Sequence, residues 1–107
     1  MKFDTAKGMR DFSPEDKILR ESILNNLKET FETYGYSPME TPIVERYDTL
    51  SSKFSAGEGT DAMREIFKLS DQGKRNLGLR FDLTVPLARY ISLNPNIKLP
   101  FKRYQVG

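Results

Sequence analysis

The segment that follows Phe12 constrains the fold most, because it carries the local signals for the start of an amphipathic helix. Ser13 can cap the helix, Pro14 suits its first position, and the acidic pair Glu15-Asp16 faces the positive end of the helix dipole. Apolar side chains then recur every three or four residues, at Leu19, Ile23, Leu27, Phe31 and Tyr34. We expect a helix over residues 14–34 that buries one face.

The chain after this helix is predicted to be extended. Gly35 can adopt the left-handed conformation that ends a helix, and Pro38 and Pro42 disfavour helix in the residues before them. A proline cannot donate a hydrogen bond to a sheet ladder. The segment therefore fits a short strand at the edge of a sheet or at a subunit boundary.

Two segments with strand character, 64–70 and 76–82, are separated by a predicted turn at 71–74. The second segment alternates Leu77, Leu79 and Phe81 with Gly78, Arg80 and Asp82. Because successive side chains of a strand point to opposite faces, one set should be buried and the other exposed. We predict a β-hairpin with the leucines and the phenylalanine in the core.

The remaining segments complete an α+β pattern in one domain. Thr84 can cap a second helix that closes at Asn94-Pro95, and residues 101–106 have the character of another strand. Residues 51–63 are rich in Ser, Gly and Ala and predict a mobile loop, which is a candidate lid.

The composition excludes several classes of site. The chain has no cysteine and no histidine, which excludes disulfides, thiolate nucleophiles, zinc sites and histidine-based triads. Its 17 basic and 15 acidic residues are interspersed, so the net charge of +2 predicts no strong attraction for nucleic acid. No apolar run approaches the roughly 18 residues of a membrane span, and the N-terminus lacks the apolar core of a signal peptide. We expect a cytoplasmic protein with no metal site and no membrane partner.

The residues Arg80, Asp82 and Thr84 are the main candidates for a binding site, because they share one face of the predicted strand. A carboxylate there suits a cationic ligand such as an α-ammonium group, and Arg80 could be its positive neighbour or could bind a phosphate. The alternative is an exposed Arg80–Asp82 pair that contributes little, with Thr84 only capping the next helix.

Other segments are weaker candidates. Gly57-Glu58-Gly59 lacks the strand and the Lys-Ser/Thr pair of a phosphate-binding loop, so a flexible loop is favoured. Lys98, Lys102 and Arg103 are interleaved with aromatic residues and could contact RNA, but the exposed side of a strand explains them better. The acidic residues form no recognisable catalytic pair.

Four segments carry a resemblance to a known family. They are KGMRDFSPED (7–16), YGYSPMETPIVE (34–45), LRFDLTVPLARY (79–90) and LPFKRYQVG (99–107). In this order and spacing they resemble the histidine-tRNA ligases, a class II aminoacyl-tRNA synthetase family whose catalytic domain is an antiparallel sheet flanked by helices. The third segment is the most specific of the four.

The resemblance implies roles for several residues. The first helix and the strand ending near Pro42 resemble motif 1, which builds the dimer interface, so a homodimer is implied. Asp82, Leu83 and Thr84 match the position that binds L-histidine, where the acidic side chain engages the amino group and the threonine assists. ATP with Mg²⁺ and tRNA(His) are the other implied ligands, and residues 55–60 match a mobile segment near the active site.

The resemblance also implies that residues 1–107 are the N-terminal portion of the catalytic domain, with motif 1 and the start of motif 2. The catalytic arginines, motif 3 and the anticodon-binding domain are then expected outside this chain, which should not aminoacylate tRNA alone. The intact family makes histidyl-adenylate and transfers histidine to tRNA(His). Two alternatives stay open: the synthetase-like regulatory subunit of ATP phosphoribosyltransferase, and a non-catalytic interaction module.

Overall fold

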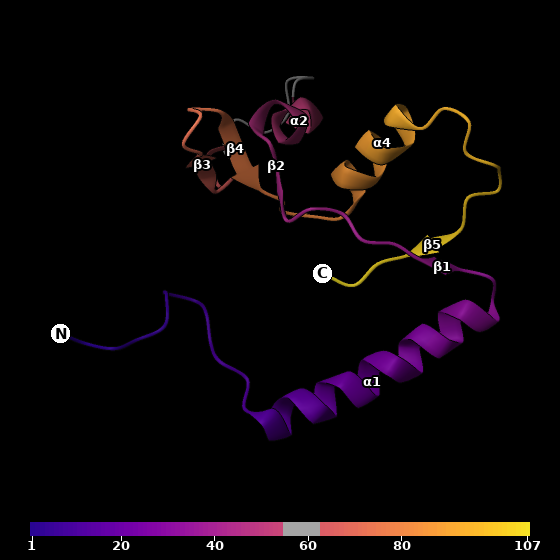
Figure 1. Cartoon of the computed structure of the whole chain (residues 1–107), viewed down its shortest axis with the longest axis horizontal. Coiled ribbons are helices and arrows are strands. Elements are labelled where there is room, and N and C mark those ends of the chain that lie inside the picture. The colour runs from indigo at the N-terminus through magenta and orange to yellow at the C-terminus, as the bar shows by residue number, and fades with distance from the viewer. Residues whose placement is uncertain (55–62) are drawn as a thin grey trace. The chain divides into compact units, whose positions relative to one another are not determined.

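The computed structural model describes residues 1–54 and 63–107, so most of the candidate lid, with its Gly57-Glu58-Gly59 segment, lies outside the described residues. The prediction of a loop is wrong for residues 51–54, which are helical. The described chain divides into two compact units, Met1–Pro38 and Met39–Gly107. Helices and antiparallel strands are both present (Figure 1), which confirms the expected α+β class. In the part of the chain that the structure describes, no helix combines the length and apolar character needed to cross a membrane.

The first unit is built on the predicted helix, α1, which spans Pro14–Thr33 and is followed by the two-residue strand β1, Ser37–Pro38. The Ser13 hydroxyl accepts a hydrogen bond from the Asp16 N–H at 3.2 Å, so the predicted cap is confirmed. Gly35 has a φ of 82°, as expected for the residue that ends a helix.

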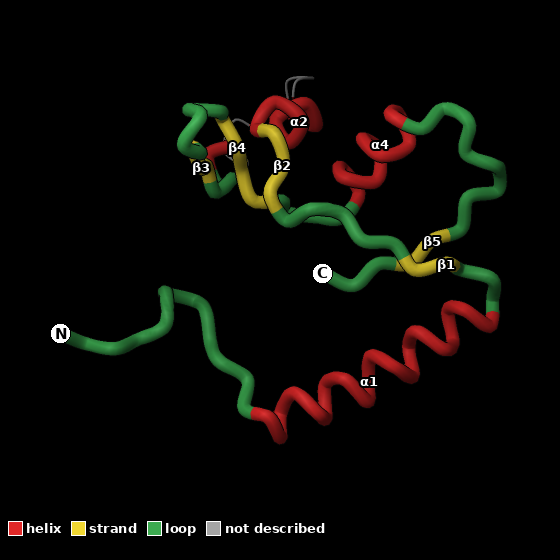
Figure 2. The backbone as a smooth tube through the Cα atoms, viewed as in Figure 1, coloured by secondary structure: helices red, strands yellow, loops and turns green. Residues whose placement is uncertain are grey.

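The prediction that α1 buries one face is wrong for this chain, because no residue of α1 is buried. The apolar stripe runs along the helix but stays exposed, and Leu19 keeps 62% of its surface accessible. Within its own unit α1 is accompanied only by the extended segment before it and by β1, as Figure 2 shows. Phe31 contacts the ring of Tyr36, with centres 6.3 Å apart, but this contact does not bury the stripe.

The second unit contains a three-stranded antiparallel sheet in the order β2-β4-β3. The strands span Val44–Arg46, Asn76–Leu79 and Lys68–Ser70 in that order. The predicted hairpin is confirmed, with Leu69 opposite Leu77, but both strands are shorter than expected. Asp71 closes the turn, because its side chain accepts a hydrogen bond from the Arg75 N–H at 2.9 Å. The short strand expected between Gly35 and Pro42 is β1, and β2, which begins after Pro42, was not predicted.

The helix α2, Tyr47–Ser51, and the 3₁₀ turn η1, Ser52–Phe54, follow β2 directly, and α2 packs on the sheet (Figure 1). Leu50 of α2 is fully buried and lies over Gly78 in the central strand. Glu45, which is opposite Gly78 in the sheet, is also buried on this face. The predicted assignment of faces is therefore wrong: the Gly78 face is covered, and Phe81 remains 43% exposed.

The physical reason for this reversal is the missing side chain of Gly78. A Cβ atom at this position would lie 2.9 Å from Leu50 Cδ1 and 3.1 Å from Ile66 Cγ2. Glycine thus leaves the space into which Leu50 and Ile66 pack, and both belong to the small buried core.

The helix α4 spans Thr84–Leu93, and the strand β5 spans only Arg103–Tyr104 of the predicted 101–106. Asn94 ends the helix as predicted, and its side chain donates to the Tyr90 carbonyl at 2.8 Å. Thr84 is the first helical residue and not the cap. Tyr104 of β5 is buried, and its carbonyl accepts a hydrogen bond from the Met39 N–H at 3.0 Å.

Replacing Gly78 with alanine tests the close packing in the core. We expect Gly78→Ala to lower the free energy of unfolding by about 1–3 kcal/mol, because Leu50 and Ile66 must move to admit a methyl group. The measurement is urea denaturation followed by circular dichroism. Gly73→Ala is the matched control, because a Cβ there meets only the side chains of Arg75 and Asp71. A Gly78→Ala protein as stable as the control would contradict this account.

Candidate functional site

Asp82 lies in the connection between β4 and α4, and both of its carboxylate oxygens accept hydrogen bonds. Oδ1 accepts the backbone N–H groups of Thr84 at 3.2 Å and Val85 at 3.1 Å. Oδ2 accepts the Thr84 hydroxyl at 2.9 Å. The carboxylate thus satisfies N–H groups of the first turn of α4, which have no partner within the helix, and the negative charge suits that end of the helix.

Lys53 is the positive neighbour of Asp82. Its Nζ lies 2.8 Å from Asp82 Oδ2 and 5.5 Å from the centre of the Phe81 ring. Phe54 also contacts Phe81, with ring centres 5.5 Å apart, so η1 packs against the connection between β4 and α4. The sequence pattern did not indicate Lys53, because it is 29 residues from Asp82. Its position depends on how α2 packs on the sheet, for which no local signal exists.

Arg80 does not have the role expected of it. β4 ends at Leu79, so Arg80, Asp82 and Thr84 do not form the predicted row along a strand. The Nη1 group of Arg80 donates instead to the backbone carbonyl of Thr41 at 2.9 Å. Asp82 and Thr84 do meet, through the hydroxyl, while the proposed Arg80–Asp82 pairing is replaced by Lys53–Asp82.

Leu83 contributes its backbone to the site. Its carbonyl accepts a hydrogen bond from Nη2 of Arg103 at 3.4 Å, which connects the Asp82-Leu83-Thr84 turn to β5. Arg103 is half-buried, whereas Lys98 and Lys102 are exposed, so the basic cluster predicted from residues 98–104 is not one exposed face. Its arginine supports the turn.

The surroundings of Asp82 change its acidity. Partial burial alone would raise the pKa of the Asp82 carboxyl, but the hydrogen bonds from Lys53, the Val85 N–H and the Thr84 hydroxyl, with the charge of Lys53, lower it overall. Asp82 is therefore an anion at neutral pH. A fixed anion with 27% of its side chain exposed can be reached by a cationic ligand.

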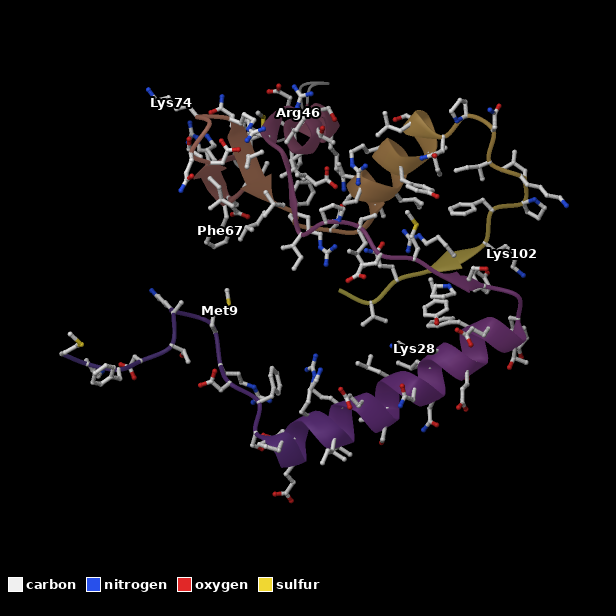
Figure 3. All side chains as sticks on the ribbon, in the orientation of Figure 1. Met9, Lys28, Arg46, Phe67, Lys74 and Lys102 are labelled. Carbon is white, nitrogen blue, oxygen red and sulfur yellow. The ribbon has the colours of Figure 1, made fainter. Side chains whose placement is uncertain are left out.

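An open groove of about 850 Å³ lies beside this turn, between α2 with η1 on one side and α4 on the other. Lys53, Thr84 and Arg89 line it, together with Arg46, which Figure 3 labels near α2. The groove is large enough for an amino acid. Among residues 1–54 and 63–107, no three histidine, cysteine or acidic side chains lie together as a metal site would require.

An ion pair between a buried carboxylate and a half-buried arginine fixes the helix that carries the site. Nε of Arg89 in α4 lies 2.9 Å from Oε2 and 3.1 Å from Oε1 of Glu45 in β2. Only 5% of the Glu45 side chain is exposed. Loss of Arg89 would leave the charge of Glu45 buried without compensation, which makes the pair a strong constraint on where α4 lies relative to the sheet.

The lowered pKa of Asp82 predicts a specific pH dependence of stability. A carboxylate whose folded pKa is below its unfolded value stabilises the fold above the unfolded pKa of about 3.9 and loses this contribution as pH falls through the folded pKa. Asp82→Asn should therefore be less stable than wild type by a constant amount between pH 5 and 7. The difference should shrink below about pH 4. Urea denaturation at each pH measures it, and a difference that grows in acid would contradict the prediction.

Comparison with known proteins identifies the family. The model of the family described as histidyl-tRNA synthetase matches residues 8–105. A histidine-tRNA ligase of Bacillus cereus is 48% identical over all 107 residues, and one of Aeropyrum pernix is 47% identical over 102 residues. The chain covers 24% and 23% of these relatives, so it spans about a quarter of their length.

Solved structures agree with this result. A histidyl-tRNA synthetase from a Nostoc species superposes on the whole chain with a TM-score of 0.82 at 35% identity, and the chain covers 23% of it. A Bacillus halodurans protein described as an ATP phosphoribosyltransferase regulatory subunit/histidyl-tRNA synthetase gives 0.77 at 32% identity, with 98% of this chain and 27% of that one covered. The expected synthetase-like α+β fold is confirmed, and the chain belongs to the histidyl-tRNA synthetase family.

Proposed function

We propose that this chain is the N-terminal portion of the catalytic domain of a histidine-tRNA ligase, and that its Asp82-Leu83-Thr84 turn binds the amino group of L-histidine. The family match covers residues 8–105, and the named relatives are histidine-tRNA ligases. The observation that carries the site assignment is the fixed, ionised carboxylate of Asp82 beside an open groove.

The chemistry of the turn suits an α-ammonium group. Such a group carries a positive charge and three N–H donors, and it pairs with a carboxylate through charge-assisted hydrogen bonds. Asp82 supplies the carboxylate, and the Thr84 hydroxyl, 2.9 Å from Oδ2, supplies a second oxygen beside it. The backbone donors from α4 hold the carboxylate in one orientation, so little conformational entropy is lost when the ligand binds.

In the proposed reaction the histidine carboxylate attacks the α-phosphorus of ATP, which forms histidyl-adenylate and releases pyrophosphate. A hydroxyl of the terminal ribose of tRNA(His) then attacks the histidyl carbonyl carbon, which forms the ester and releases AMP. Residues of this chain would orient the histidine by its amino group, which accelerates the attack by positioning. ATP with Mg²⁺ is the second substrate in this proposal, and the described residues offer no group of three histidine, cysteine or acidic side chains that would hold the metal.

Under the same proposal, the protein is a homodimer and lies in the cytoplasm. Exposed apolar residues of α1, such as Leu19 and Leu27, support the dimer, because a continuous apolar stripe on a helix is stabilised when another surface covers it. The match of the segment before Pro42 to the family's dimer motif points the same way.

The second candidate is a synthetase-like regulatory subunit of ATP phosphoribosyltransferase. The solved Bacillus halodurans protein carries both descriptions and is 32% identical to this chain. Such a subunit would use the same turn to bind histidine but would form no adenylate. The two candidates therefore share a binding site and differ in chemistry.

Two measurements on the full-length protein test this proposal. Isothermal titration should show that histidine binds, and that Asp82→Ala weakens binding roughly 10- to 100-fold through loss of a charge-assisted hydrogen bond. Histidine-dependent exchange of pyrophosphate into ATP should show the ligase reaction. Asp71→Asn is the matched control, because this carboxylate is also ion-paired, at 2.6 Å from Arg75 Nε, but lies in the β3–β4 turn.

The outcomes separate the candidates. Histidine binding without pyrophosphate exchange would favour the regulatory subunit. An Asp82→Ala protein that binds histidine as tightly as wild type and the Asp71→Asn control would reject the site.

A further inference from the structure

We propose that, in the absence of histidine, the ammonium group of Lys53 occupies the position on Asp82 that the amino group of histidine takes when it binds. Lys53 must then be displaced for histidine to bind. This inference rests on the proposed function of the Asp82 turn. It adds a competing cation, contributed by η1, to the recognition of the substrate's α-ammonium group.

Four donors surround the carboxylate of Asp82. A carboxylate has about four positions at which it accepts a hydrogen bond. Oδ1 accepts two backbone N–H groups, and Oδ2 accepts the Thr84 hydroxyl and the Lys53 ammonium. These four donors fill the acceptor positions, so an incoming ammonium group has to replace one of them.

Lys53 is the donor that can leave at the least cost. The two N–H groups belong to the first turn of α4 and cannot move without disrupting the helix, and the hydroxyl is fixed to the same turn. Lys53 is held by a flexible four-carbon chain, and 48% of its side chain is exposed. Its departure breaks one exposed ion pair and one contact with the Phe81 ring.

The groove provides both the route for the ligand and the space for the displaced lysine. Lys53 and Thr84 both line it, and both donate to Asp82 Oδ2, so a ligand in the groove meets the two side chains that flank this oxygen. An ammonium group of the ligand and that of Lys53 carry the same charge and seek the same oxygen. Their repulsion makes the exchange of one cation for the other more favourable than simultaneous binding.

Recognition by exchange has a consequence for selectivity. A ligand with an α-ammonium group can replace Lys53 and keep Asp82 neutralised. A ligand without one, such as imidazolepropionate, leaves the Lys53–Asp82 pair in place and gains nothing from Asp82. Lys53 therefore lowers the affinity for histidine while it holds the empty site in a neutral, ordered state.

The test uses Lys53→Met in the full-length protein, with Lys74→Met, an exposed lysine of the hairpin turn, as the matched control. Isothermal titration should give a dissociation constant for histidine that is roughly two- to fivefold lower in Lys53→Met, which corresponds to the strength of an exposed ion pair. The affinity for imidazolepropionate should stay unchanged. Lys53→Arg, which keeps the charge, should not bind histidine more tightly than wild type.

A second measurement checks the ion pair without a ligand. In NMR titrations of the empty protein, the pKa of the Asp82 carboxyl should be higher in Lys53→Met than in wild type, since a charged donor has been removed. An unchanged pKa would overturn the inference. So would Lys53→Met binding histidine as weakly as wild type or more weakly, because Lys53 would then not compete.

The two proposals fail in different ways. If wild type shows no histidine binding, or binding that does not depend on Asp82, the proposed site falls and this inference falls with it. If histidine binding depends on Asp82 but is not strengthened in Lys53→Met, only the role of Lys53 is rejected.

Discussion

The arrangement of the second unit depends on the close approach of Leu50 to Gly78. Because Gly78 has no side chain, Leu50 of α2 can lie against the backbone of the central strand and become fully buried. This contact determines which face of the sheet α2 covers. η1 follows α2 without interruption, so the same contact also determines the position of the Lys53 backbone. From this position the Lys53 side chain can reach Asp82. A packing constraint in the core therefore sets the electrostatics of the site.

Three sets of interactions stabilise the site. The backbone of α4 holds the Asp82 carboxylate, Arg103 of β5 holds the Leu83 carbonyl, and the Glu45–Arg89 pair holds α4 to β2. The buried charge of Glu45 makes the last connection the most costly to break. Charged side chains near the site thus divide into two groups: buried or half-buried ones that fix the geometry, and more exposed ones, such as Lys53, that can move.

The sequence predicted those elements whose stabilising contacts join residues close together in the chain. The start of α1 followed from Ser13 and Pro14, and the hairpin followed from its turn, because in both cases the partners are a few residues apart. The covered face of β4 could not be predicted in this way. Alternation shows that two faces differ, but which one is buried depends on α2, whose Leu50 is 28 positions before Gly78 in the chain. The strand pattern indicated Asp82 and Thr84, the resemblance to a family added Leu83 and the ligand, and only the folded chain added Lys53.

Because every acceptor position of Asp82 is filled, its carboxylate is already neutralised before a ligand binds. An empty, unpaired carboxylate beside α4 would favour the binding of any cation, and its negative charge would be partly desolvated without a partner. With Lys53 in place, the carboxylate stays neutralised before the ligand arrives, and under the proposed function it is neutralised equally when histidine replaces the lysine. Binding then changes little in the net charge at Asp82. The free energy gained comes mainly from the rest of the ligand, so a small cation without the histidine side chain gains little by displacing Lys53.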